Sequence, residues 1–121
     1  MLRLDPKEAE AHSGLGYVQA CRKAPAEARV AAGRALLHGG GKYLVIHNIA
    51  CVYAKLAQTD TARAAEYEDL AVDHLRRAVE LWRKVGETGL NEIQLIKDEV
   101  AFHPALRARP DFQELLRPQK P

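Results

Sequence analysis

Residues 43–85 constrain the fold more than any other stretch, because their apolar side chains recur at intervals of three and four. One stripe consists of Tyr43, Ile46, Ile49, Ala50, Val52, Tyr53 and Leu56, and the other of Leu70, Ala71, Leu75, Ala78, Val79 and Trp82. This spacing is typical of α-helices, and the polar segment 58–61 between the stripes predicts a turn. The stretch therefore predicts two antiparallel helices, each with an apolar stripe too wide for one partner helix to bury.

The remaining sequence extends this prediction to an all-α fold in a single domain, 1–121. Aromatic residues make up only 6% of the chain, and no run alternates apolar and polar side chains as a half-buried strand would. A first helical pair is predicted over 7–38, an elongated second pair over 42–86, and a C-terminal capping segment over 91–117. Ala71 and Ala78 are expected at the buried contact between the helices of the second pair.

The first pair is expected to have a thin core, because alanine and glycine occupy much of it. Its first helix is predicted over 7–22, and Pro25 begins the second helix. Gly14 and Gly16 each weaken the first helix by roughly 1 kcal/mol relative to alanine, so we expect them to allow close contact with a neighbouring helix. The residues expected to face inward are Ala11, Leu15, Val18, and Ala20 or Cys21.

Two runs of the second pair carry a resemblance to a known family. I-H-N-I-A-C-V-Y-A at 46–54 and A-V-D-H-L-R-R-A-V at 71–79 resemble the two helices of a tetratricopeptide repeat. These runs are most similar to the C-terminal repeats of bacterial tetratricopeptide proteins and of some bacterial serine/threonine kinases. The chain departs from the pattern at Ile46, where an aromatic residue is usual, and in a longer spacing between Ala50 and Ala71. The resemblance implies an α-solenoid fragment built from helical hairpins.

The two ends of the chain fit the same resemblance. The run A-L-R-A-R-P-D-F-Q-E-L-L at 105–116 is similar to the segment that closes such arrays, which implies that Phe112 and Leu115 shield the long helix of the second pair. The opening run L-R-L-D-P has two interpretations. It is the end of a preceding repeat that this chain lacks, or Asp5 caps a first helix that begins at Pro6.

The resemblance also implies a function, because the first helices of such repeats line a groove that holds a peptide or a partner helix. The corresponding positions here are Ser13, Tyr17, Leu44, His47, Cys51 and Lys55. We therefore expect a non-catalytic protein–protein interaction or scaffold module. One alternative is a regulatory module of a larger bacterial signalling enzyme, a kinase or cyclase, whose catalytic domain is absent here. Another is a helical protein that binds a metal ion or a small ligand.

The sequence predicts no catalytic residue, no cofactor and no metal site. His47 and Cys51 have the spacing of two metal ligands on one helix, but a zinc site would need further ligands, for which His12 or His38 are the candidates. Asp98 and Glu99 are adjacent and would point apart on a helix, which is poor geometry for paired carboxylates. The glycines at 39–41 follow a predicted helix and lack the motif of a phosphate-binding loop.

Charge and cysteine content limit the partners. The chain carries 18 basic and 16 acidic residues, interleaved, so we expect no nucleic-acid partner. No apolar run is long enough for a membrane span, and the N-terminus lacks the apolar core of a signal peptide. The two cysteines lie within predicted helices, which favours a reducing cytoplasm. We expect a protein or peptide partner, with self-association into a homo-oligomer left open.

Overall fold

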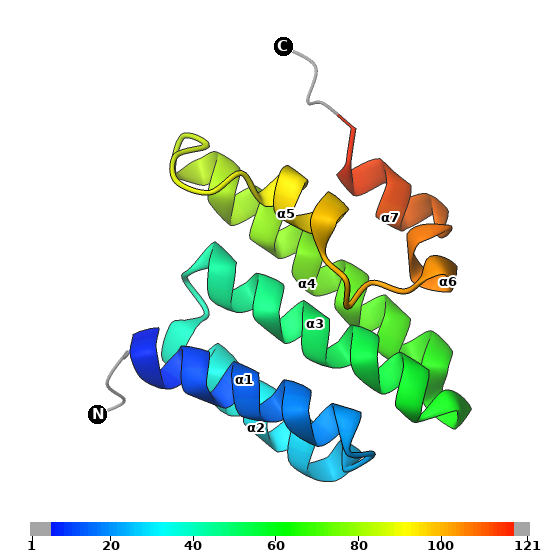
Figure 1. Ribbon diagram of the computed structural model, residues 1–121. Coiled ribbons are helices and arrows are strands. Elements are labelled where there is room, and N and C mark those ends of the chain that lie inside the picture. Colours follow the sequence, from blue (N-terminus) through cyan, green and yellow to red (C-terminus); the bar gives the residue numbers. More distant parts are fainter. Residues whose placement is uncertain (1–5, 118–121) are drawn as a thin grey trace.

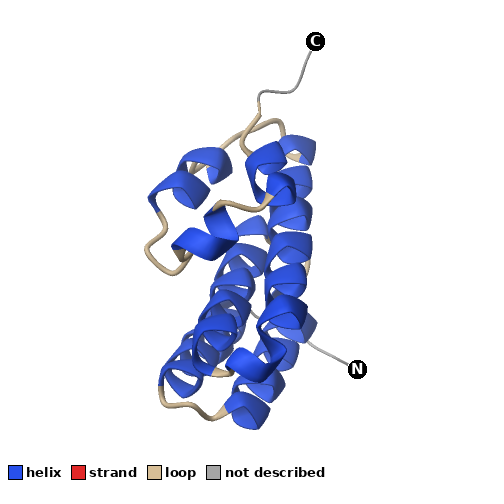
Figure 2. Cartoon of the chain, turned by 90° about the vertical axis from the view of Figure 1, so that its right-hand side faces the viewer, coloured by secondary structure: helices blue, strands red, loops and turns tan. Residues whose placement is uncertain are grey.

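The computed structural model describes residues 6–117, and the regular secondary structure in this range is entirely helical (Figure 2). The all-α prediction is confirmed, whereas Asp5 and its proposed capping role lie outside the described residues. The helices are α1 (Pro6–Cys21), α2 (Pro25–Gly39), α3 (Tyr43–Thr59), a short 3-10 turn (Thr61–Arg63), α4 (Ala64–Lys84), α5 (Glu92–Asp98), α6 (Pro104–Arg107) and α7 (Pro110–Leu115).

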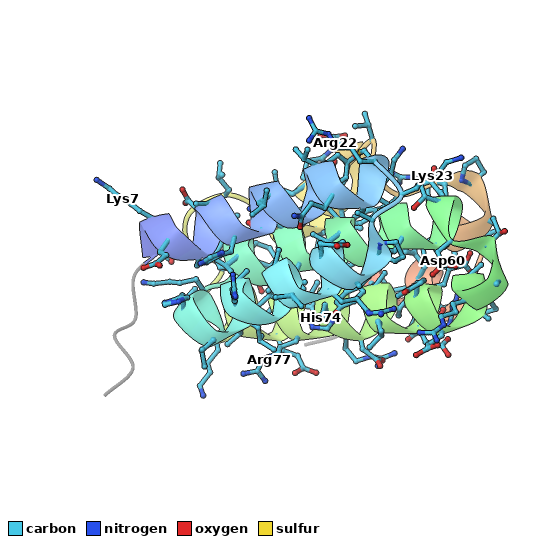
Figure 3. The ribbon with its side chains drawn as sticks, turned by 90° about the horizontal axis from the view of Figure 1, so that it is seen from below. Lys7, Arg22, Lys23, Asp60, His74 and Arg77 are labelled. Atoms are coloured by element: carbon cyan, nitrogen blue, oxygen red, sulfur yellow. The ribbon has the colours of Figure 1, made fainter. Side chains whose placement is uncertain are left out.

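The four long helices form two antiparallel pairs that pack on each other. Helix α1 packs along α2, α3 packs along α4, and α3 also contacts both helices of the first pair (Figure 1). The turn at Arg22 and Lys23 lies at the same end of the molecule as the turn at Asp60, so the two hairpins point the same way (Figure 3). The segment that contains α5, α6 and α7 folds back over the second pair, on the side away from α2 (Figure 1).

The inward face of α1 differs from the predicted one. It is made of small buried residues at helical spacing, Ala9, Ser13, Gly16 and Ala20. A Cβ atom on Gly16 would come within 3.3 Å of Ala31 Cβ and of Val52 Cγ2, which shows how closely α1 approaches α2 and α3. The prediction that Ala11, Leu15 and Val18 face inward is wrong, because all three are exposed and the close contact selects small side chains at other positions. Of the two alternatives at the end of the helix, Ala20 is the buried one and Cys21 is exposed.

A second close approach joins the two pairs at Gly39. A Cβ atom there would lie 2.7 Å from Ala9 Cβ and 3.0 Å from Val45, closer than side-chain atoms can pack. Gly39 therefore lets the end of α2 and the start of α3 meet α1 directly. Gly14 differs, since a Cβ atom on it would meet nothing within 4 Å, so the expectation that Gly14 serves a close helix contact is wrong.

The second pair buries larger side chains. Ile46, Ile49, Val52 and Leu56 of α3 are almost fully buried, as is Tyr67 of α4. Ala71 and Ala78 are 0% exposed, which matches the position predicted for them at the contact between the two helices. The hydroxyl of Tyr67 accepts a hydrogen bond from Arg29 of α2 (2.6 Å), so a polar contact also ties α4 to the first pair.

The C-terminal segment covers α4 with aromatic and aliphatic side chains. Phe102, Leu106, Phe112 and Leu115 are buried in one cluster with Leu75 and Val79 of α4. Arg109 adds an ion pair with Asp69 of α4 at 2.6 Å. The start of the segment is fixed by Asn91, whose side chain accepts a hydrogen bond from the backbone of Gln94 (3.1 Å) and so caps α5. Among residues 6–117, no helix combines the length and the apolar character that crossing a bilayer requires.

Candidate functional site

The candidate site is centred on His47 and Cys51 of α3. They are four positions apart in the sequence, so their side chains lie one above the other on the same face of the helix. Both are buried, in a chain whose other buried polar or charged side chains are only Ser13 and Glu92 among the described residues. A buried imidazole requires polar partners, and the structure supplies them from a distant part of the sequence.

Both ring nitrogens of His47 meet a carboxylate from the α5 region. Glu92, in the first turn of α5, is fully buried and places Oε1 2.5 Å from Nδ1. Glu99, directly after the last residue of α5, places Oε1 2.9 Å from Nε2. The imidazole is thus held between the two ends of one short helix, which fixes the position of α5 against α3.

The segment that carries Glu99 is itself held in place by Arg107. The Arg107 guanidinium donates hydrogen bonds to the carbonyl oxygens of Phe102 (2.7 Å), Lys97 (3.1 Å) and Glu99. The Phe102 ring packs against His47, with the ring centroids 5.7 Å apart. The second oxygen of Glu99 accepts a hydrogen bond from the backbone of Ala101 at 3.3 Å. These contacts limit the movement of Glu99 relative to α3.

The electrostatics favour a charged imidazole beside an ionised Glu99. Burial alone would lower the pKa of His47, but hydrogen bonds with Cys51, Glu92 and Glu99 outweigh it and raise that pKa to about 11. The hydrogen bond from His47 is the main cause that lowers the pKa of Glu99 to about 2. Burial raises the pKa of Glu92 despite its contact with His47.

Cys51 lacks the character of an activated nucleophile. Burial raises the pKa of its thiol to about 11, although the neighbouring His47 acts in the opposite direction. Nucleophilic cysteines need a lowered thiol pKa. The arrangement therefore gives no support to Cys–His nucleophilic catalysis.

A partly open cavity of about 320 Å³ lies beside these residues, between α1 and α3. Its lining consists of Glu10, Ser13, Gly14 and Tyr17 from α1, Asn48 and Cys51 from α3, and Glu99. Of the residues predicted to line a groove, the structure brings Ser13, Tyr17 and Cys51 to this cavity. His47 lies behind it, in contact with Glu99.

Two predicted groove residues stand apart from the cavity. Leu44 is 38% exposed at the start of α3, and Lys55 is half-buried one turn beyond Cys51; neither contributes to the lining. Their roles in partner binding stay predictions. His12 and His38 also lie elsewhere: their rings stack on each other with centroids 5.5 Å apart, and His12 Nε2 lies 3.7 Å from Glu8.

Sequence reasoning missed Glu92 and misjudged Glu99. The comparison of Glu99 with its neighbour Asp98 was correct about geometry, since Asp98 instead accepts hydrogen bonds from Gln94. The carboxylate that shares His47 with Glu99 is Glu92. It lies seven residues earlier, about two helical turns away, so both carboxylates can face α3. The seven-residue spacing of the two glutamates becomes a usable sequence signal once it is known that both contact His47.

Comparison of the chain with protein-family models, with curated proteins and with solved structures finds no match. The function must therefore be argued from this geometry.

Proposed function

We propose that the protein is a non-catalytic binding module of tetratricopeptide type, whose cavity between α1 and α3 receives part of a partner peptide or helix. The observation that carries the proposal is the cavity itself, about 320 Å³, with an aromatic ring and several hydrogen-bonding groups in its lining. Its position between the first helices of the two pairs is where the sequence resemblance implies a binding groove. Two antiparallel pairs with parallel-stacked hairpins are compatible with that resemblance.

The lining indicates which chemical group of a partner would fit. Glu10 and Glu99 are acidic, Ser13 and Asn48 are polar, and the part of the lining that the structure describes includes no lysine, arginine or histidine. Glu99 is already paired with His47, so Glu10 is the lining carboxylate free of that contact. Tyr17 adds a ring that can contact the alkyl chain or the charge of a cation. The cavity therefore suits a lysine or arginine side chain projecting from an extended peptide or a helix.

Lys55 extends the proposal along α3. It lies one helical turn beyond Cys51, outside the cavity lining, where it could contact an acidic residue of the same partner. The proposed partner segment thus carries a basic side chain opposite the cavity and an acidic one beyond it. Such charge complementarity contributes mainly to the association rate and to specificity.

The experiment is selection of peptides from a random display library on the purified protein, followed by affinity measurement on variants. We expect enriched peptides to contain lysine or arginine, and Tyr17→Ala to weaken their binding about tenfold or more, as a central aromatic contact does. Glu10→Lys should weaken binding through charge repulsion. Leu15→Ala is the matched control, because Leu15 is on the same helix but lines a different surface, beside α2.

Two results would contradict the proposal. One is a library that enriches no peptide above the background of an unrelated protein. The other is a set of peptides that bind the Tyr17→Ala and Glu10→Lys variants as tightly as the unmodified protein, with unchanged melting curves for both variants.

A further inference from the structure

We propose that His47, Cys51 and Glu99 form a Zn²⁺ site, in which Glu92 orients the histidine. The inference goes beyond peptide binding and rests on separate observations, the geometry of four side chains. Because Cys51 and Glu99 also line the cavity, a bound ion would compete with a basic side chain for Glu99. It also revises the expectation from the sequence, which found His47 and Cys51 but looked for the missing ligand at His12 or His38.

The first argument is the convergence of three different ligand atoms. One atom each from His47, Cys51 and Glu99 lie within 4.8 Å of one another. Zinc binds thiolate sulfur at about 2.3 Å and imidazole nitrogen or carboxylate oxygen at about 2.0–2.2 Å. Ligand atoms that already lie this close together need only small side-chain adjustments to coordinate one ion.

The second argument is the orientation of His47. Its Nδ1 faces the buried Glu92 carboxylate at 2.5 Å, so Nε2 is the nitrogen directed toward Glu99. Zinc-bound histidines commonly donate their other ring N–H to a carboxylate, which fixes the tautomer and makes the ligand nitrogen more basic. Nε2 lies within hydrogen-bond distance of Glu99, and a metal ion would take the place of the proton between them. Coordination by Cys51 also requires loss of the thiol proton, so binding of one Zn²⁺ would release both protons to solvent.

The third argument is the free-energy cost of burying the Glu92 carboxylate. Its side chain is 0% exposed, and its second carboxylate oxygen, Oε2, has no hydrogen-bond partner within residues 6–117. A buried carboxylate needs compensating positive charge, and one imidazolium must serve both Glu92 and Glu99. Zn²⁺ would displace one proton from His47 and one from Cys51, so the net charge of the cluster would not change. Glu99 would then pair with the ion, which leaves the Nδ1–H of His47 to Glu92 alone.

The fourth argument is access. Cys51 and Glu99 both line the cavity, so an ion bound between them would be open to it on one side. Three protein ligands leave the fourth position of tetrahedral zinc for a water molecule or a donor group from another molecule. The mixed nitrogen, sulfur and oxygen donors favour zinc over magnesium or calcium, which prefer oxygen ligands alone.

The test uses Co²⁺ as a spectroscopic substitute for Zn²⁺ on the metal-free full chain. Thiolate coordination gives an intense sulfur-to-cobalt charge-transfer band, which we expect at an equimolar end point and expect Zn²⁺ to abolish by displacement. Cys51→Ala should lose the band, whereas Cys21→Ser, which changes the exposed cysteine, should keep it. Glu92→Gln should keep the band but weaken Zn²⁺ affinity about 10–100-fold, as removal of a carboxylate behind a ligand histidine does.

Several outcomes would overturn the inference. The absence of a charge-transfer band in the unmodified protein would do so without reference to any variant. A band that survives Cys51→Ala, or that disappears in Cys21→Ser, would place the metal elsewhere. Metal binding that gives no charge-transfer band, and that is abolished by His12→Ala, would assign the ion to the cluster of Glu8, His12 and His38. Circular dichroism of each variant in chelator separates loss of a ligand from loss of the fold.

Discussion

The two helical pairs differ in the size of the side chains that they bury. In the first pair the buried positions hold alanine, at Ala9, Ala20 and Ala28 among others, while Leu15 and Val30 remain about half exposed. In the second pair Ile46, Leu56, Tyr67 and Leu75 are buried, and the C-terminal segment adds Phe112. The first pair thus gains close helix contact with little apolar area, and the second gains area from large side chains.

Because of this difference, the second pair and the C-terminal segment supply most of the stability, whereas the first pair leaves more large apolar side chains on the surface. Burial of large apolar side chains contributes about 25 cal/mol per Å² removed from water, so most of the hydrophobic stabilisation lies between α3, α4 and the C-terminal segment. The large apolar side chains of the first pair contribute little to that core, because they face outward. Truncation of a large apolar side chain should therefore cost much more stability in the second region than in the first.

The largest effect is expected from Phe112→Ala. Phe112 is completely buried against the α4 cluster, and its ring packs edge-on against Phe102 with centroids 5.8 Å apart. Truncation should lower the free energy of unfolding by about 3–5 kcal/mol, from lost burial and the cavity left behind. Urea denaturation measures this change. A loss no larger than that of Leu36→Ala, a control on the exposed side of α2, would show that the segment does not cover the core.

Overpacking should affect both pairs, and by a smaller amount. Ala71→Leu in α4 and Ala28→Leu in α2 each insert a large side chain at a position that is 0% exposed. Each should lower the free energy of unfolding by about 1–3 kcal/mol, because the neighbouring helices must move apart. Thermal melts of the two variants compare the contacts directly. If Ala28→Leu were neutral, the first pair would be looser than the structure shows.

The pH dependence of stability tests the contacts of His47, with metal removed by a chelator. Because the folded-state pKa of His47 is raised from 6.5 to about 11, its stabilisation is complete below pH 6.5 and is lost as the pH rises toward 11. The stability difference between the unmodified protein and His47→Gln should shrink by an amount on the order of 1 kcal/mol between pH 6.5 and pH 8. A difference that stayed constant or grew over this range would contradict the direction of the shift.

The variant Glu99→Gln tests the contact between His47 and Glu99 at low pH. The folded-state pKa of Glu99 is lowered from 4.5 to about 2, so its stabilisation is present above pH 4.5 and is lost as the pH falls toward 2. The advantage of the unmodified protein over Glu99→Gln should therefore diminish on acidification below pH 4.5. Urea titrations at several pH values measure it, and an advantage that increased toward pH 2 would be inconsistent with this contact.

The smallest effect is expected on the exposed face of the first pair. Leu15→Ala and Val30→Ala remove side chains that are 49% and 54% exposed, so each should change the free energy of unfolding by less than about 0.5 kcal/mol. A destabilisation above 1 kcal/mol, measured by urea denaturation, would mean that these residues are covered in solution. Dependence of that value on protein concentration would identify the cover as a second copy of the chain.

The sequence by itself determined the helices and part of the core. The apolar spacing of 43–56 and 70–82 defined α3 and α4, and the predicted C-terminal segment begins at Asn91, whose side chain caps α5 by accepting a hydrogen bond from a free backbone N–H. These features are local, since helix periodicity and capping depend on residues within a few positions of one another. The same local pattern failed for α1, where it favoured Leu15 and Val18 as core residues.

Only the tertiary structure decided which face of α1 is buried and which side chains meet at the candidate site. Small residues face inward on α1 because two other helices approach it closely, and that approach is a property of the packed helices. Glu92 and Glu99 lie 45 and 52 residues from His47 in the chain, and the chain must turn back between α4 and α5 before they meet it (Figure 1). Periodicity specifies the face of each helix, but a contact between distant carboxylates and a histidine depends on how the helices pack.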